Sequence, residues 1–330
     1  MTPTTIAAYS LLAVYSAAAV YVIAFIVSVV DLARRSSEVL AAQPLAASAG
    51  SVSAAGASAS SGTTVAAPPR PPAAASATAV ASPASRLQRV AFALTVLGFV
   101  IHVAAIVLRG VAASRAPWAN MFEFALTGTA VIVGVYLLVS IWRDVRYLSA
   151  YITGLVTLLL MLATMNVYVD IVPLPPALQS AWLVVHVFVA ILGTGFFALG
   201  AGLSIAQLLQ ARREAGSSSL RFLGGFPGSE TLENLAYRVN VIGFAFWTFT
   251  LIAGAIWAEH AWGRYWGWDT KEVWTFIIWV VYAGYIHARA TRGWRGSRSA
   301  WLAIVGFTAV LFNFTIVNLF FKGFHAYSGL

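Results

Sequence analysis

Long apolar runs dominate the chain, and short polar or glycine- and proline-containing segments separate them. Eight of these runs are about 20 residues long, the length of helix that crosses the ~30 Å hydrocarbon core of a bilayer. They cover approximately residues 6–30, 90–112, 122–142, 147–168, 182–209, 238–258, 272–289 and 300–321. The pattern therefore predicts an all-α polytopic membrane protein with about eight transmembrane helices.

The composition supports this prediction and excludes several classes of protein. Of the 330 residues, 60% are hydrophobic and only 9% are charged, whereas a soluble globular domain carries about 25% charged residues. A soluble cytoplasmic enzyme is therefore excluded. Because the chain has no cysteine, it cannot use thiolate metal ligands, disulfide bonds or dithiol redox chemistry of its own.

The distribution of basic residues predicts the orientation of the helices, because cytoplasmic loops carry an excess of Lys and Arg. With the N-terminus outside, fifteen basic residues are cytoplasmic and five lie on or near the other side. Both termini are therefore predicted to be extracytoplasmic. The net charge of +9 then anchors the loops to anionic membrane lipid, and nucleic acid is not a predicted partner. The five basic residues outside are Arg109, Arg115, Arg264, Lys271 and Lys322.

The chain is predicted to have three parts. Residues 1–35 form an N-terminal transmembrane helix, which lacks the basic n-region of a signal peptide and exceeds the length of its apolar core. Residues 36–85 consist largely of Ala, Ser, Gly and Pro without any aromatic residue. They cannot bury enough apolar surface to fold, so we predict a disordered cytoplasmic linker. Residues 86–330 form a seven-helix domain.

The five histidines are the first candidates for chemistry. The predicted topology places His186, His260 and His325 at the extracytoplasmic face, His287 in the inner leaflet and His102 near the middle of the membrane. For any one of them, a hydrogen-bonded packing role is the simpler interpretation. Ionisable groups within a membrane are nevertheless functional candidates because placing them there is costly. Two imidazoles from different helices can ligate a haem iron, whereas no histidine pair has the spacing for a zinc site on one helix.

A tryptophan-rich segment at 257–274 is the second candidate. It holds five of the chain's twelve tryptophans. An interfacial aromatic belt is one interpretation, but the density of indoles, with Gly263 and Gly267 between them, favours a platform for a flat apolar ring.

Charged residues accompany these tryptophans. Arg264 and Lys271 are candidates to bind ligand carboxylates, with Asp269 and Glu272 holding the two bases in place. Asp269 is also a candidate N-cap for the next helix, because Asp-Thr-Lys-Glu resembles a helix start. Both roles are compatible.

Three segments together resemble one family. The run from Trp262 to Trp274, followed by His287 in the next helix, resembles the WWD signature of haem-handling proteins in cytochrome c maturation. The segment 117–123 resembles that superfamily's Pro-x-x-Asn-x-Tyr-Glu turn, with Phe122 in place of the usual Tyr; by itself it is only a proline-containing turn before a helix. The ending 317–327 resembles the C-terminus of the CcsA (ResC) branch of System II.

The resemblance covers residues 90–330 and leaves out the first helix and the linker. The superfamily also includes the CcmC and CcmF proteins, but eight spans and the C-terminal histidine favour the CcsA branch. The resemblance implies a cytochrome c synthase of the haem lyase type, formed with a CcsB (ResB) membrane subunit. Haem b crosses the membrane, and its vinyl groups are attached to the Cys-x-x-Cys-His thiols of apocytochrome c. A bacterial cytoplasmic membrane, or a thylakoid membrane, is the implied location.

Site residues are implied in the same way. His186 and His325 match the ligands of an external haem beneath the WWD loop, and His287 matches the ligand of an intramembrane haem whose opposite ligand comes from the partner subunit. The remaining residues expected around the external haem are Trp262, Trp266, Trp268, Asp269, Trp274 and Arg264. No side chain is predicted as a general base, since positioning is the main requirement. A separate thiol–disulfide reductant is implied because this chain has no cysteine.

Other functions are compatible with some of these features. A transporter of amphipathic anions is expected to show internal repeats and broken helices in matching halves, and the sequence has neither. A b-type electron-transfer cytochrome usually pairs its ligands across helices in the core, whereas three histidines here are expected at one face. A haem-delivery protein of the CcmC type shares the WWD loop and stays open as the nearest alternative.

Overall fold

The computed structural model describes residues 2–54, 85–291 and 293–325, and all regular structure within these ranges is helical. The all-α prediction is therefore confirmed. The α-helices are α1 (Pro3–Ala54), α2 (Arg86–Ala113), α3 (Met121–Trp142), α4 (Ser149–Asn166), α5 (Ala181–Glu214), α6 (Ser229–Trp262), α7 (Thr270–Thr291), α8 (Ser297–Phe312) and α9 (Asn318–Phe320). Short helical turns are η1 (Arg146–Leu148), η2 (Pro176–Leu178), η3 (Ser218–Gly225) and η4 (Asn313–Val317), of which η4 is a π-helix.

Seven helical segments of the described chain are long and apolar enough to cross a membrane. The protein is therefore a polytopic membrane protein, as the hydropathy pattern predicts. The eighth predicted span, 272–289, is present as α7, a helix of 22 residues. Lys271, Glu272 and several Trp and Tyr side chains make α7 less apolar than the other seven segments, although its length suffices. The orientation of the termini stays a prediction.

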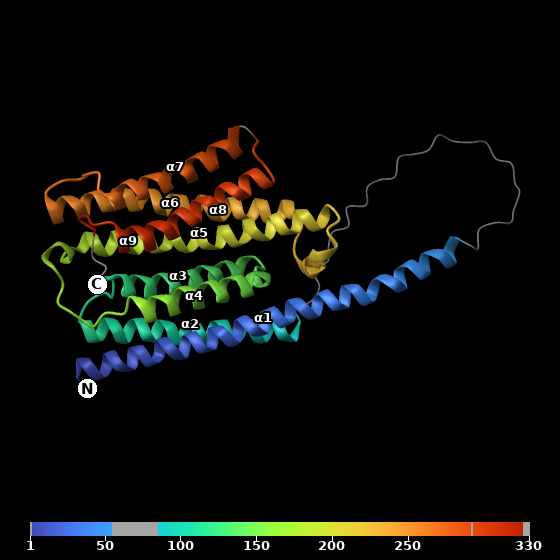
Figure 1. The fold of residues 1–330 in the computed structure, drawn as a ribbon, viewed down its shortest axis with the longest axis horizontal. Coiled ribbons are helices and arrows are strands. Elements are labelled where there is room, and N and C mark those ends of the chain that lie inside the picture. Colours follow the sequence, from blue (N-terminus) through green and yellow to red (C-terminus); the bar gives the residue numbers. More distant parts are fainter. Residues whose placement is uncertain (1, 55–84, 292, 326–330) are drawn as a thin grey trace, which may run out of the picture.

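Helix α1 continues well past the predicted end of the first span. Residues 36–54, which we expected to begin the linker, are helical, because alanine has the highest intrinsic helix propensity. Residues 55–84 lie outside the described residues, so the linker stays a prediction there. Figure 1 shows the C-terminal part of α1, in blue, extending beyond the ends of the other helices.

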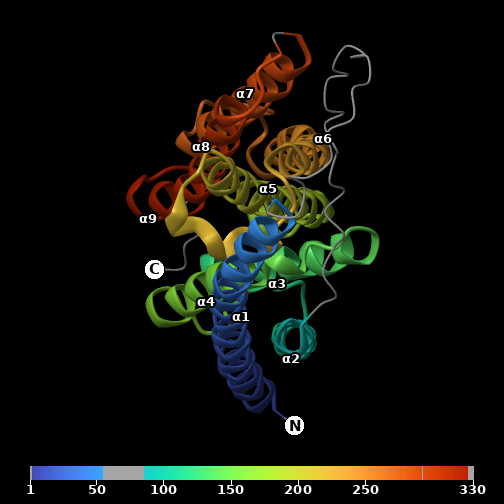
Figure 2. The same ribbon diagram turned by 90° about the vertical axis from the view of Figure 1, so that its right-hand side faces the viewer.

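Helix α5 lies at the centre of the bundle, where it packs against α3, α6 and α8. Helix α1 packs against α2 and α4 on one side of the bundle, and α7 packs against α8 on the other. Figure 2 shows these groups on either side of α5. Small residues allow these close approaches. Gly193 of α5 faces the backbone of α6 at Gly243, and Gly195 faces α3 at Val131 and Val135.

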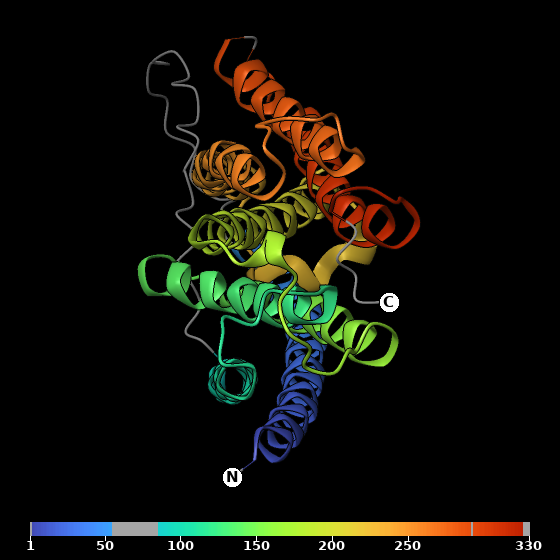
Figure 3. The ribbon, with the colours of Figure 1, turned by 90° about the vertical axis from the view of Figure 1, so that its left-hand side faces the viewer.

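The connecting segments gather at the two ends of the bundle. Figure 3 looks onto the end that carries the N-terminus, the loops 114–120, 167–180 and 263–269, and the segment 321–325. The segments that we predicted to be extracytoplasmic thus share one end.

A buried ion pair joins α6 and α7 at the opposite end. The Nη1 of Arg289 donates to Oε1 of Glu233 over 3.0 Å, and its Nη2 donates to Oδ1 of Asn234 over 2.7 Å. Oε2 of Glu233 also accepts the backbone N–H of Gly296, just before α8. One carboxylate therefore ties together the ends of three helices.

Substituting Glu233→Gln is expected to lower the free energy of unfolding by about 3–5 kcal/mol, because it leaves Arg289 as an unpaired charge. Both side chains of the pair are only 8% exposed. Thermal unfolding in detergent micelles measures the effect. Glu230→Gln is the matched control, since Glu230 lies 3.9 Å from Arg295 but is 80% exposed, where an ion pair contributes about 0–1 kcal/mol. Equal melting temperatures for the two variants would contradict the prediction.

Candidate functional site

A cavity of about 210 Å³ lies among α3, α5, α6, α7 and α8, towards the end shown in Figure 3. Its walls are mainly apolar, with Ile132, Leu183 and Leu251 among them. Two of the predicted iron ligands, His186 of α5 and His325 after α9, line this same cavity. The fold therefore brings together two imidazoles that are 139 positions apart in the sequence.

Helix α6 fixes the ring of His186. Its Nδ1 lies 3.0 Å from the carbonyl oxygen of Thr250. Because a carbonyl only accepts, Nδ1 carries the proton and the neutral ring keeps its lone pair on Nε2. Gly254 makes this approach possible, since a Cβ there would lie 2.7 Å from Cε1 of His186. Trp257 stacks on the other side of the ring, with centroids 5.6 Å apart. Nε2 is therefore the nitrogen available to a metal.

Asp269 connects the start of α7 to His325. Its Oδ1 accepts the N–H of Lys271 over 2.8 Å, and Oε2 of Glu272 accepts the N–H of Asp269 over 3.0 Å. This reciprocal pair is a capping box and confirms the predicted N-cap. Oδ2 of Asp269 accepts the backbone N–H of His325 and lies 3.3 Å from its Nδ1. A carboxylate on the Nδ1 side of an imidazole is the arrangement that orients histidine ligands in metal sites.

The surroundings of Asp269 keep it ionised. Burial alone raises the pKa of its carboxyl, but the interaction with the His325 side chain and the hydrogen bond from the N–H of Lys271 outweigh burial. The pKa of Asp269 therefore lies well below its usual range. The carboxylate that holds His325 stays charged at neutral and mildly acidic pH.

The tryptophans of the WWD segment take different positions. Trp257 and Trp266 line the cavity, and Trp262 meets the ring of His325 edge-on at 4.9 Å. Trp268 is 74% exposed at the surface. Trp274 packs on Phe312 of α8 at 4.5 Å and is not among the residues that line the cavity. The structure thus brings only part of the predicted platform to the cavity and its histidines.

Arg264 lies within the loop, away from the cavity wall. Its guanidinium lies 4.5 Å from the centroid of the Phe324 ring and 3.8 Å from Oε1 of Glu272. It also rests on the backbone of Gly267, where a Cβ would come within 1.0 Å of Nη1. A larger residue at this position would displace the guanidinium. Arg264 therefore packs within the loop. Among the described residues that line the cavity, Lys271 is the only lysine or arginine.

The other three histidines are not brought to the cavity. His287 lies on the exposed side of α7, fifteen residues after Glu272 and therefore about 22 Å along the helix. His260 is exposed, with Nδ1 2.8 Å from the carbonyl oxygen of Ile256. His102 is fully buried in α2, and its Nδ1 lies 3.4 Å from the hydroxyl of Tyr21 in α1. His102 thus packs between α1 and α2, and its buried Nε2 has no hydrogen-bond partner within the described residues.

Sequence reasoning missed one wall of the cavity. Helix α3 contributes Ala125, Gly128, Thr129 and Ile132, a spacing that places all four on one helical face. This row of mostly small residues is a signal in the sequence that could have identified the wall. It leaves space beside α3 where a larger residue would fill the cavity.

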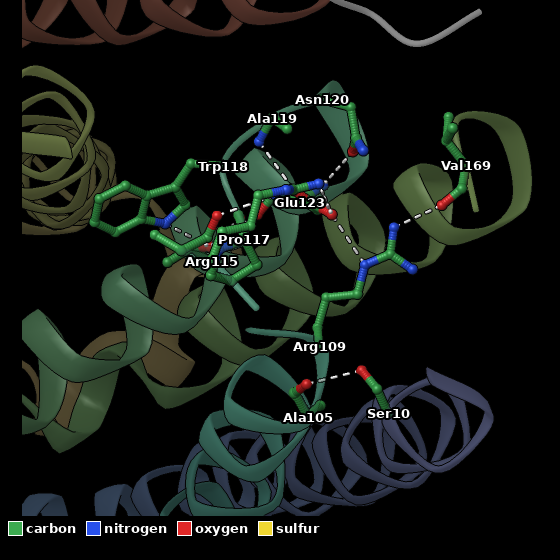
Figure 4. A network of polar contacts seen from close by, with 12 residues as sticks. Ser10, Ala105, Arg109, Arg115, Pro117, Trp118, Ala119, Asn120, Glu123 and Val169 are labelled. Carbon is green, nitrogen blue, oxygen red and sulfur yellow. Dashed lines mark hydrogen bonds and ion pairs between the residues drawn. The ribbon is translucent and has the colours of Figure 1, made fainter. Parts of the chain in front are cut away.

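A buried carboxylate holds the turn before α3. Figure 4 shows Glu123 between Arg109 of α2 and Arg115 of the turn. Oε1 accepts from Nε of Arg109 over 3.0 Å, and Oε2 accepts from Nη1 of Arg115 over 2.7 Å. The backbone N–H of Ala119 donates to Oε2 as well, and Asn120 caps α3 by accepting the N–H of Glu123. The proline-containing turn is therefore tied down by one acidic side chain.

This network also shapes the cavity. Nη2 of Arg109 donates to the carbonyl of Val169 over 2.7 Å, which attaches the loop after α4 (Figure 4). Trp118 lies in the turn, donates its Nε1 to Thr127 over 3.1 Å and lines the cavity. Glu123 thereby positions a cavity wall without itself lining the cavity.

Comparisons with known proteins give a consistent result. Residues 118–325 match the family described as "Cytochrome C assembly protein". The "Cytochrome c biogenesis protein CcsA" of Guillardia theta is 35% identical over an alignment of 234 residues that covers 65% of this chain and 77% of that protein. The protein of the same name from Trieres chinensis is 32% identical over an alignment of 252 residues that covers 67% of this chain and 81% of that protein.

A solved structure shares the fold. The "Cytochrome c Heme Lyase CcmF" has a TM-score of 0.63 and 17% sequence identity with this chain, over 95% of its residues. The match covers 47% of CcmF, so the chain spans about half the length of that protein. At this level of identity the likeness establishes a common fold alone.

Substituting Glu123→Gln is expected to speed cleavage by trypsin after Arg115. The neutral amide cannot compensate two arginines, so the turn is released and the free energy of unfolding falls by about 3–5 kcal/mol. Mass spectrometry of the fragments measures the rate at that bond. Asp144→Asn is the control, because Asp144 also pairs with an arginine, Arg146, but is 55% exposed. If trypsin cleaves the peptide bond after Arg115 at the same rate in Glu123→Gln as in the wild type, Glu123 does not hold the turn.

Asp269 gives a prediction about pH. Its pKa is lower in the folded protein than in the unfolded chain, so its contribution to stability is complete at neutral pH and is lost as the pH falls below the usual value of about 3.9. The difference in melting temperature between wild type and Asp269→Asn is therefore expected to be largest near neutral pH and to shrink below about pH 4.

Melting temperatures measured from neutral to acidic pH test this expectation, with Asp170→Asn in an exposed loop as the control. A difference that stays constant over the whole range would show that the charge of Asp269 has no part in stabilising the site.

Proposed function

Because the chain belongs to the cytochrome c assembly protein family and is of the CcsA type, we propose that its cavity holds haem b for covalent attachment to apocytochrome c. A role in cytochrome c biogenesis follows from the family. The observation that carries the haem site is the pair His186 and His325, which line one cavity. Nδ1 of His186 lies 3.0 Å from a carbonyl oxygen, and Nδ1 of His325 lies 3.3 Å from a carboxylate oxygen of Asp269. Each Nε2 is left for the iron.

The other cavity residues suit a porphyrin. Apolar side chains from α3, α5 and α6 provide surface for the ring, and Trp257 and Trp266 provide aromatic faces. Trp257 contacts both imidazoles, stacking on His186 and meeting His325 edge-on at 5.4 Å. Its Nε1 donates to the carbonyl of Ala177 over 3.0 Å, which fixes the indole that lies next to both histidines.

The proposed reaction adds a cysteine thiol of apocytochrome c across each haem vinyl group. A carbon–sulfur bond forms, the thiol hydrogen goes to the neighbouring vinyl carbon, and no oxidant is needed. The chain's own contribution is to hold the ring so that vinyl and thiol meet, which replaces part of the entropy cost of the encounter. Since this chain has no cysteine, a separate thiol–disulfide reductant keeps the thiols reduced.

A second haem position is proposed within the membrane at His287. Its side chain lies on the exposed side of α7, where a neighbouring subunit can reach it. We therefore propose that a CcsB (ResB)-type membrane subunit supplies the opposite ligand. The excess of basic residues at the other end of the bundle supports an extracytoplasmic WWD loop, in a bacterial cytoplasmic membrane or a thylakoid membrane.

The test uses the chain purified together with its partner subunit. His186→Gly and His325→Gly are each expected to lower the haem content and change the absorption spectrum of the external site, and added imidazole is expected to restore both. The control is His260→Gly, since His260 is at the same end of the bundle but exposed and outside the cavity.

Unchanged haem content in the double variant His186→Gly/His325→Gly would refute the ligand roles. In the same preparation, haem becomes covalently bound to added apocytochrome c if the complex is a synthase. Binding and release of haem without any thioether would instead identify a haem-delivery protein.

A further inference from the structure

We propose that the ammonium group of Lys271 binds a propionate of the haem and thereby sets the orientation of the ring within its plane. This inference rests on the proposed function of the cavity as a haem site. It identifies the residue that decides which edge of the porphyrin is presented to apocytochrome c.

Lys271 lies in the cavity wall with an incomplete set of partners. Its Nζ donates to Oδ1 of Asn318, a neutral amide. An ammonium has three N–H donors. Within the described part of the chain, no carboxylate lies within ion-pair distance of Nζ. Asp269 acts on this ammonium only electrostatically, from beyond that distance, and Glu272, which also lines the cavity, lies beside Arg264.

This arrangement calls for an anion. Enclosing a charge without an opposite charge is costly, and a bound carboxylate in contact with the ammonium offsets much of that cost. Haem b carries two propionates on one edge of an otherwise apolar ring, so it supplies the missing charge where the ring enters an apolar cavity. Lys271 is one of two lysines among the chain's twenty basic residues.

The wall around Lys271 is polar, whereas most of the cavity is apolar. Asn313 and Asn318, at the start and just after the end of the π-helix η4, line the cavity next to Thr275 of α7. Nδ2 of Asn313 donates to Oγ1 of Thr275 over 3.3 Å. A π-helical turn changes the register of a helix and is frequent at functional sites. The polar edge of the haem is therefore expected on this side.

The other basic residues near the WWD segment fit this role less well. The guanidinium of Arg264 rests on Gly267 and Phe324 and does not line the cavity. Lys322 is exposed and is also absent from the cavity wall. Holding the propionates at Lys271 directs the vinyl-bearing half of the ring away from α7.

The experiment compares haem with haem dimethyl ester, whose propionates are neutral. Both are titrated into the purified complex, and binding is followed by the absorption of the histidine-ligated iron. The wild type is expected to bind haem at least about tenfold more tightly than the ester, which corresponds to about 1.4 kcal/mol. Lys271→Met is expected to remove this preference, and Lys271→Arg to keep most of it. The matched control Lys322→Met is expected to behave as the wild type.

Several results would overturn the proposal. A preference for haem that survives in Lys271→Met would show that another group binds the propionates. Equal weakening of both ligands in Lys271→Met would show a purely structural role. Equal binding of haem and ester by the wild type, with a spectrum that depends on His186 and His325, would overturn this inference and leave the proposed function standing. A wild-type complex that binds neither ligand would overturn both.

Discussion

The arrangement of the site depends on the contacts that the carboxylate of Asp269 makes with the start of α7 and with His325. One carboxylate oxygen caps α7, and the other accepts the backbone N–H of His325 and lies 3.3 Å from Nδ1 of its ring. The same group therefore fixes where a helix begins and where the chain's last described histidine lies. Because the cap is part of a reciprocal box with Glu272, the start of α7, the WWD loop and the candidate ligand form one connected unit.

Charged side chains that stabilise the ends of the bundle are paired with opposite charges. Glu123 compensates two arginines at one end, and Glu233 compensates Arg289 at the other. Each of these carboxylates also accepts backbone N–H groups from loops, so charge pairing and loop placement are a single contact. Lys271 differs, because its ammonium contacts a neutral amide and faces the cavity. The paired carboxylates Glu123 and Glu233 therefore maintain the fold, whereas the ammonium of Lys271 is available to a ligand.

The two proposed haem positions follow from where the histidines are exposed. His186 and His325 line one cavity, so this chain alone provides both rings. His287 lies on an outward face of α7, where a single chain offers one ligand and a second subunit is needed for the other. The proposed function would use this difference, with one site shared between subunits and one site complete in this chain.

The sequence alone determined the helical elements and their local chemistry. The helices follow from the length and periodicity of apolar runs, which depend only on neighbouring residues, and the cap of α7 follows from Asp269 and Glu272 being three positions apart. The first helix was predicted too short, because the alanine-rich segment 36–54 has too little apolar patterning to indicate a helix but a high helix propensity.

Only the tertiary structure decided which side chains reach the cavity. It joins His186 and His325 through the packing of α5, α6 and the chain after α9, and it places Arg264 on Gly267 and Trp274 on Phe312 instead of in the cavity wall. These positions depend on contacts between segments far apart in the sequence. Spacing along one helix gives the face on which a residue lies, but the neighbour of that face is set by how the helices pack.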